Sequence, residues 1–323
     1  MALEIDPDNS LKPLPTADLT TSRAGLRLRS GFKALLLLFA LFMVLLPRNR
    51  ISPLVYPLLF GVPLVYAASR RDTERAFLLW TTYAISFATF IVFRRLADDT
   101  GVPWFHSYVI QIDKVIGLGT VPTVAFQHLW FRPSVPSALD AITIGFHLSY
   151  YLVPPAIGIV LWVAATQSVF ERYLLAVAMT YLVGLLVHFI LPTIPPWMAG
   201  NSGYTAPIAR VLYVRVHSAW PTFYSFGNAL AGGNDVAAMP SLHMATAFLV
   251  ACGLKRLGKI AAFIGALYAM GMGFSLVYTG EHFVADLLGG ILIAWVCWLA
   301  APRLIDRVLS LAPGSLPAAE GIR

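Results

Sequence analysis

Long apolar stretches separated by short polar segments dominate this chain of 323 residues. Most of the stretches approach the roughly 20 apolar residues that an α-helix needs to cross the hydrocarbon core of a membrane. The pattern predicts an all-α, polytopic membrane helical bundle of eight spans, with about six core spans and extra N-terminal spans. Seven spans, or six with an interfacial helix, stay open as alternatives. The predicted runs are 33–46, 51–69, 76–93, 139–165, 171–192, 240–254, 258–279 and 283–301.

Two longer polar connections separate these runs. Segment 94–138 is mixed in character and rich in aromatic side chains, which favours an interfacial helix. Segment 193–239 is rich in Pro, Gly, Trp and Tyr, so a loop with several turns is expected there. Each connection therefore has room for residues that act at one face of the membrane.

The two ends of the chain differ from its middle. Residues 1–30 are polar, contain proline and end in basic residues, which predicts a disordered cytoplasmic tail. The first apolar run is expected to be an anchor and not a cleaved signal sequence. Residues 31–310 form the predicted integral membrane domain, with its polar motifs in a core at 140–300, and residues 311–323 form a C-terminal tail.

Composition supports the membrane interpretation. The chain is 58% hydrophobic and only 12% charged, with a mean hydropathy of +0.72, which excludes an ordinary soluble domain. Its net charge of +7 would suggest a nucleic-acid partner in a soluble protein, but here it is better explained by topology, and no nucleic-acid partner is expected. With the N-terminus inside, 15 basic residues fall in inner segments and 8 in outer ones. This bias predicts that residues 193–239 lie on the extracytoplasmic side. The short loops and lean tails are compatible with a prokaryotic plasma membrane.

One polar cluster stands at the start of an apolar run, in the sequence "MPSLH" at residues 239–243. Pro240 suits the first turn of a helix, where its missing N–H costs nothing. The free N–H groups of that turn, with Ser241 beside them, are predicted to form an anion site. His243 follows just inside the helix, and a histidine at membrane depth usually faces a polar partner.

A second polar cluster, "YTGEHFVADLLGG" at residues 278–290, lies between the last two apolar runs. His282 and Asp286 are four residues apart, so they are expected to share one face of a helix. The carboxylate can then fix the imidazole tautomer and raise the basicity of the other ring nitrogen. Together with the first cluster, this predicts a phosphoryl-transfer site. His282 would attack phosphorus, and His243 would protonate the leaving oxygen and then deprotonate the acceptor.

The two clusters resemble the second and third motifs of the type 2 phosphatidic acid phosphatase superfamily. The resembling residues are Pro240-Ser241-x-His243 and His282-x-x-x-Asp286, and the resemblance covers roughly residues 140–300. It implies an integral membrane, helical enzyme that acts on lipid phosphates through a phosphohistidine. It also implies that no metal and no cofactor take part.

Two departures from the phosphatase pattern separate this chain from the phosphatases themselves. The Ser-Arg pair that opens their third motif is Ser275-Leu276 here, and residues 191–200, "LPTIPPWMAG", lack the lysine and Arg-Pro of their first motif. The Pro-Pro-Trp segment followed by the two clusters is closer to the inositol phosphorylceramide synthase branch of inositolphosphotransferases. Members of that branch use a His-His-Asp triad to move a phosphorylated head group between lipids. The resemblance assigns the triad here to His243, His282 and Asp286.

Binding a phosphate requires positive charge, which neither cluster supplies. Basic residues in the predicted outer segments are therefore candidates, and the sequence does not choose among them. These candidates are Arg94, Arg95, Lys114, Arg210 and Arg215. The other residues predicted to contact substrate are Pro240, Ser241, Trp197 and Tyr278.

Several other polar residues have structural interpretations. His147 and His188 are expected to be satisfied structural residues, although "FHLSYYLVPP" could instead face the site. Glu281 is expected to be a solvated loop charge. Interfacial positions are expected for His106, His128 and His217, close helix packing for Gly289-Gly290, and ordinary packing for Cys252 and Cys297.

Three functions of different kinds remain open from the sequence. The leading hypothesis is a transferase that moves a phosphorylated head group, for which the resemblance suggests phosphoinositol, from a phospholipid donor to a lipid alcohol. The second is a lipid phosphate phosphatase in which water accepts the phosphoryl group. The third is a lipid transporter or scramblase, which is disfavoured because the chain shows no internal repeat and its polar groups cluster at one face. The sequence carries no information on the oligomeric state.

Overall fold

The computed structural model describes residues 74–96, 101–222, 224–225, 234 and 236–310, with the side chains of 306–310 excepted. All of them belong to the unit Leu46–Arg323. The predicted runs at 33–46 and 51–69 and the two predicted tails lie outside the described residues. Within the described ranges the regular structure is helical, with two isolated β-bridges, so the predicted all-α class is confirmed.

Among the described residues, four helices are long and apolar enough to cross a membrane, as expected for an integral membrane protein. A shorter helix, α11 (Leu242–Leu254), has 13 residues and packs against three of them, α8, α12 and α13. The four long helices are α3 (Glu74–Phe93), α8 (Gln167–Ile190), α12 (Lys259–Tyr278) and α13 (Val284–Ser310).

The run at 139–165, predicted as one span, is broken into α6 (Ala138–Ser149) and α7 (Val153–Ala164), which are bent by 59°. Pro154 and Pro155 lie in the first turn of α7. Because proline has no backbone N–H, neither residue can continue the hydrogen bonds of α6 across the break. Counted as one bent span, the pair raises the number of candidate spans to five.

Close approach of α13 to the start of α11 depends on a small residue. A Cβ atom added at Gly290 would overlap the carbonyl oxygen of Ser241. This agrees with the close packing predicted for the Gly289-Gly290 pair. The glycine therefore lets the two segments that carry the sequence motifs approach within backbone contact.

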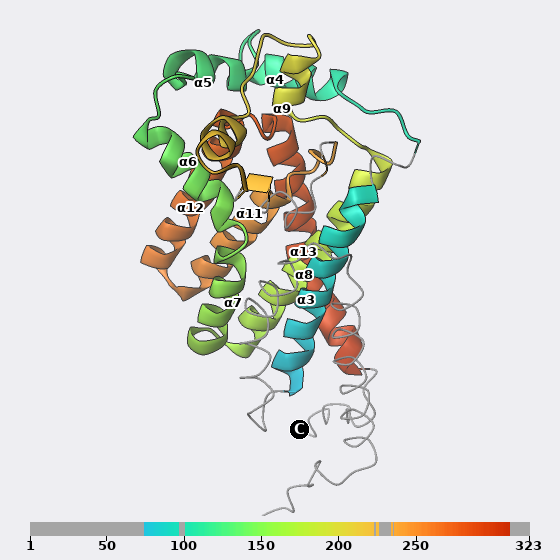
Figure 1. Ribbon diagram of the computed structural model, residues 1–323. Coiled ribbons are helices and arrows are strands. Elements are labelled where there is room, and N and C mark those ends of the chain that lie inside the picture. Colours follow the sequence, from blue (N-terminus) through green and yellow to red (C-terminus); the bar gives the residue numbers. More distant parts are fainter. Residues whose placement is uncertain (1–73, 97–100, 223, 226–233, 235, 311–323) are drawn as a thin grey trace, which may run out of the picture. The chain divides into compact units, whose positions relative to one another are not determined.

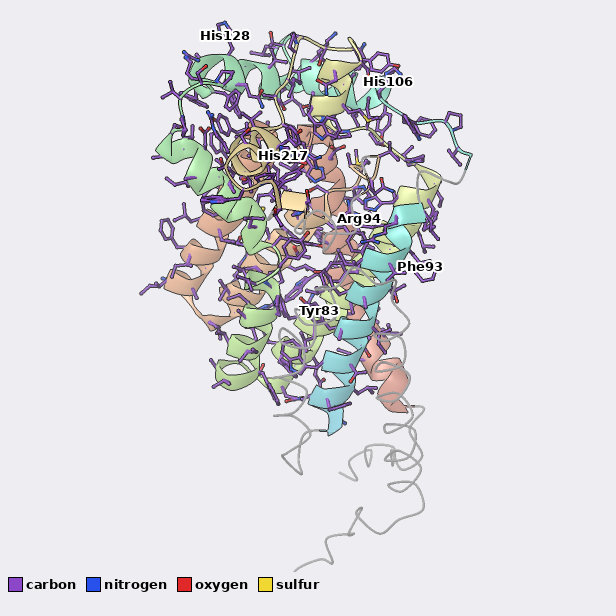
Figure 2. All side chains as sticks on the ribbon, viewed as in Figure 1. Tyr83, Phe93, Arg94, His106, His128 and His217 are labelled. Carbon is purple, nitrogen blue, oxygen red and sulfur yellow. The ribbon has the colours of Figure 1, made fainter. Side chains whose placement is uncertain are left out.

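Short helices lie together beyond one end of the long ones, at the top of Figure 1. They are α4 (Ser107–Ile116), α5 (Pro122–Trp130) and α9 (Pro196–Asn201). The predicted interfacial helix at 94–138 is thus two helices, of which α4 packs on α13 and α5 on α12. Figure 2 shows His106 and His128 in this layer. Thr193 joins the connecting segments, since it forms β-bridges with both Phe105 and Ala237.

Candidate active site

The first motif is joined directly to the last helix. Ser241 is the N-cap of α11, and its hydroxyl oxygen accepts a hydrogen bond of 3.3 Å from the N–H of Met244. Its own N–H donates to the carbonyl oxygen of Asp286 at 2.9 Å. One expectation is therefore wrong, since Pro240 precedes the helix instead of opening it. The N–H groups of Ser241 and Met244 are already paired, and an anion site at the remaining N–H groups of the turn stays a prediction.

The second motif begins in the turn after α12. His282 is in this turn and its N–H donates to the carbonyl of Leu276, while Asp286 is in the first turn of α13. The two residues therefore do not share a helical face, contrary to the sequence prediction. Even so, His282 Nδ1 lies 3.5 Å from Asp286 Oδ2, and the same carboxylate oxygen accepts the Phe283 N–H at 2.8 Å. Asp286 is fully buried, so the carboxylate is fixed against one side of the imidazole.

The two motif histidines face one another across the interface of α11 with the α12–α13 turn. The ring centroids of His243 and His282 are 5.7 Å apart. On its other sides, His243 contacts the end of α6, with centroid distances of 4.7 Å to His147 and 4.2 Å to Tyr150. We call the residues His147, His243, His282 and Asp286 the histidine cluster. Its two motif imidazoles, His243 and His282, lie within reach of one small group, and the Asp286 carboxylate can orient one of them.

Asp113 is a site residue that the sequence did not reveal. It lies on α4, is fully buried, and accepts hydrogen bonds from the N–H groups of Val284 and Ala285 at 3.0 and 2.9 Å. Burial raises the pKa of its carboxyl to about 6, although both hydrogen bonds act in the opposite direction. Asp113 thereby holds the start of α13, and with it Asp286, in place. An acidic residue within the apolar "YVIQIDKVIG" is the signal that could have drawn attention to it.

Both motifs lie within a segment that matches a known protein family. The model of the PAP2 superfamily matches residues 107–300, which is more than half of the chain. The chain belongs to the PAP2 superfamily. The resemblance seen at the two motifs is therefore confirmed, and the match includes α4, which carries Asp113.

Two curated relatives of this PAP2 protein are synthases. The phosphoinositol dihydroceramide synthase of Bacteroides thetaiotaomicron is 27% identical over 166 residues, 48% of this chain and 52% of the relative. The inositol phosphorylceramide synthase catalytic subunit aur1 of Schizosaccharomyces pombe is 24% identical over 191 residues, 56% of this chain and 44% of the relative. The chain thus spans about half the length of these relatives. No solved structure matches it significantly.

The Pro-Pro-Trp segment of this PAP2 protein packs on the second motif. The backbone N–H of Trp197 donates to the carbonyl of Gly280 at 3.1 Å. The Arg210 guanidinium lies over the Trp197 ring, 4.8 Å from its centroid, and binds the Glu281 carboxylate through contacts of 2.9 and 3.3 Å. Glu281 is only 9% exposed, so the expectation of a solvated loop charge is wrong. Residues 195–197 thereby shape the turn that carries His282.

The Arg210–Glu281 pair predicts a stability difference at acid pH. Burial alone would raise the pKa of the Glu281 carboxyl, but the Arg210 guanidinium outweighs it, and the pKa lies below the ordinary 4.5. The pair therefore stabilises the fold fully above about pH 4.5, and this contribution is lost as the pH falls through the lowered pKa. We expect Glu281→Gln to lower the Tm at pH 7 by about 2–5 °C.

Thermal unfolding of wild type and Glu281→Gln in detergent, followed from pH 7 to pH 3.5, measures this difference. The Tm values of the two proteins should converge below pH 4.5. A difference that stays constant over the whole range would show that the carboxylate charge contributes nothing.

Among the basic candidates, Arg94 differs from Arg210 and Arg215. Arg215 is paired with Asp140 at 2.9 Å, as Arg210 is with Glu281. Within the described part of the chain, no carboxylate lies within 4 Å of the Arg94 guanidinium, and its buried Nε has no hydrogen-bond partner. Figure 2 shows Arg94 at the upper end of α3, where η1 (Arg94–Leu96) follows.

The remaining predicted residues have other surroundings. Tyr278 is buried and its hydroxyl donates to Asp140 at 2.6 Å, so that group is already engaged in the fold. His188 Nε2 lies 3.1 Å from the Pro240 carbonyl oxygen, consistent with a structural residue. Arg95 shares η1 with Arg94, and Lys114 lies in the last turn of α4. Among the described residues no group of three His, Cys, Asp or Glu side chains is arranged to hold a metal ion, and a metal-free reaction stays a prediction.

Proposed function

We propose that this protein is a membrane-embedded phosphotransferase that moves a phosphorylated head group between lipids through a phosphohistidine on His282. The observation that carries the proposal is the pairing of two facing imidazoles, 5.7 Å apart, with a buried carboxylate behind one of them. We propose phosphoinositol as the head group and a ceramide-like lipid alcohol as the acceptor. The two relatives, a phosphoinositol dihydroceramide synthase and an inositol phosphorylceramide synthase subunit, support this choice.

In the first half-reaction, His282 attacks phosphorus with Nε2, because its Nδ1 faces Asp286 Oδ2 at 3.5 Å. A P–N bond forms and the P–O bond to the donor lipid breaks. His243 gives a proton to the departing oxygen, so that the donor leaves as a neutral lipid alcohol. Asp286 stabilises the positive charge that develops on the His282 ring.

In the second half-reaction, the hydroxyl of the acceptor lipid attacks the same phosphorus. His243, now neutral, takes the hydroxyl proton, the new P–O bond forms and the P–N bond breaks. Both imidazoles return to their starting states. Because water could replace the lipid alcohol at this step, exclusion of water distinguishes a transferase from a phosphatase.

Arg94 is the residue that we propose to compensate the phosphate charge. Its charge acts electrostatically on both His147 and His243, and in the part of the chain that the structure describes no carboxylate neutralises it. The charges of Arg210 and Arg215 are instead neutralised by ion pairs, with Glu281 and Asp140 respectively. With the N-terminus inside, the short helices α4, α5 and α9 lie on the extracytoplasmic side, and lipid head groups approach the site from there.

A transfer assay tests the proposed function. Purified protein in detergent receives phosphatidylinositol labelled in the head group, with and without ceramide, diacylglycerol or polyprenol. We expect label in a new lipid only when an acceptor is present. Release of free inositol phosphate irrespective of the acceptor would show that water accepts the head group, which is hydrolysis and not transfer.

A further inference from the structure

We propose that His147 contacts the substrate, donating a hydrogen bond from Nδ1 to a non-bridging oxygen of the phosphoryl group in both half-reactions. The inference rests on the proposed function and adds a third imidazole to it. Neither motif contains His147, which lies about a hundred residues before them, near the end of α6. A structural role was expected for His147 from the sequence, with a position facing the site as the alternative, and the contacts below support that alternative.

A buried nitrogen without a partner is the first observation. His147 is only 9% exposed, and its Nδ1 is buried with no hydrogen-bond partner among the residues that the structure describes. Nearly all buried polar atoms in folded proteins have a partner, because an unmade hydrogen bond costs about 1–3 kcal/mol. His188 differs in part, since its Nε2 lies 3.1 Å from the Pro240 carbonyl oxygen while its Nδ1 is also buried without a partner among the described residues.

The position of the ring is the second observation. His147 packs against His243 with a centroid distance of 4.7 Å, and Nε2 of His243 is likewise buried and has no hydrogen-bond partner in the described ranges. Two adjacent imidazoles thus carry unsatisfied nitrogens beside the proposed nucleophile. An oxygen-rich group bound between them and His282 would satisfy both nitrogens at once.

Charge is the third observation. Arg94, Arg210, Glu281 and His282 all act electrostatically on His147, which therefore lies where the charges of the site converge. A neutral imidazole donor suits this place, because it binds a phosphoryl oxygen without adding another desolvated charge. It supplies part of the stabilisation that the missing motif cations would give. His147 neither gives up nor takes a proton, so His243 alone transfers the proton of the lipid hydroxyl in each half-reaction.

Helix α6 ends beside His243, because it breaks at residues 150–152 and the Tyr150 ring lies 4.2 Å from the His243 ring. Packing of α6 on α12 supports this end of the helix, which carries His147. The Pro154-Pro155 pair prevents α7 from continuing the hydrogen bonds of α6.

Two replacements of His147 separate a contact with substrate from a packing role. His147→Leu removes the nitrogen but fills much of the space, and His147→Asn keeps an amide N–H near the position of Nδ1. The first half-reaction is followed as protein that carries the labelled head group on His282, and the whole reaction as label transferred to the acceptor lipid. We expect His147→Leu to reduce both by about 10²–10³-fold. Its Tm should equal or exceed that of wild type, because an unpartnered buried nitrogen has been removed. His147→Asn should stay within about tenfold of wild type.

Three results would overturn the inference. One is a His147→Leu protein as active as wild type. Another is a Tm lowered in both variants, with activity that follows the folded fraction, which would mean a packing role. A third is labelled protein that forms at the wild-type rate in His147→Leu while only transfer is lost, which would place His147 at the acceptor. His128→Leu, at an exposed position on α5, is the matched control and should change nothing.

This experiment can fail independently of the proposed function. If wild type turns over the donor without forming labelled protein, the covalent route is wrong. The comparison of Leu and Asn at position 147 then still reports on the contact, through total turnover of the labelled donor.

Discussion

Replacing His282 by alanine is expected to abolish head-group transfer, by a factor on the order of 10⁴ or more, because the covalent route loses its nucleophile. Folding should change little, since the contacts of the His282 side chain with Asp286, at 3.5 Å, and with the His243 ring, at 5.7 Å between centroids, are both within the site. The comparison uses equal amounts of detergent-purified wild type and variant with labelled phosphatidylinositol and ceramide.

Asp286→Asn serves as the graded control for the His282 variant. It keeps the nucleophile but weakens its orientation, so its activity should lie between those of wild type and His282→Ala. Transfer by a correctly folded His282→Ala protein at more than a few per cent of the wild-type rate would exclude His282 as the nucleophile.

Replacing His243 by alanine is expected to lower transfer from a natural donor by about 10²–10⁴-fold, the usual contribution of a general acid and base. The loss should depend on the leaving group. A donor analogue that releases p-nitrophenolate needs no proton, so it should form labelled protein on His243→Ala nearly as fast as on wild type. With phosphatidylinositol, the same variant should form labelled protein slowly.

The outcome of the leaving-group experiment distinguishes an acid from a residue that only shapes the site. His243 is packed between His147, Tyr150 and His282, so its removal also leaves space. If the two donors are slowed equally in His243→Ala, distortion explains the loss and the role as acid and base is wrong.

The two motifs and the class of fold could be predicted because their signals are local. Six of the eight predicted apolar runs fall in the described part of the chain, and each corresponds to helical structure there. The spacing within "PSLH" and "YTGEHFVAD" brought His243, His282 and Asp286 together as candidates, and their catalytic roles stay proposals. A helical period and a short motif can each be recognised within one short stretch of sequence, without information on distant segments.

The rest of the site depends on contacts between distant parts of the chain. Asp113 and Val284 are 171 positions apart, and Arg210 and Glu281 are 71 positions apart. Nothing local marks either pair, so Glu281 was taken for a solvated charge and Asp113 was missed. The contact of His147 with His243 is likewise long-range, so no local pattern distinguishes the two interpretations of His147.

The position of the covalent label tests the central claim most directly. Wild-type protein is mixed with phosphatidylinositol labelled in the head group, without acceptor, stopped under alkaline conditions, digested and analysed by mass spectrometry. We expect the mass of inositol phosphate on the peptide that contains His282, lost on brief acid treatment as a P–N bond requires, and lost also when ceramide is added before the stop. Label on His243 or on another residue, or an unlabelled protein that still transfers the head group, would contradict the account.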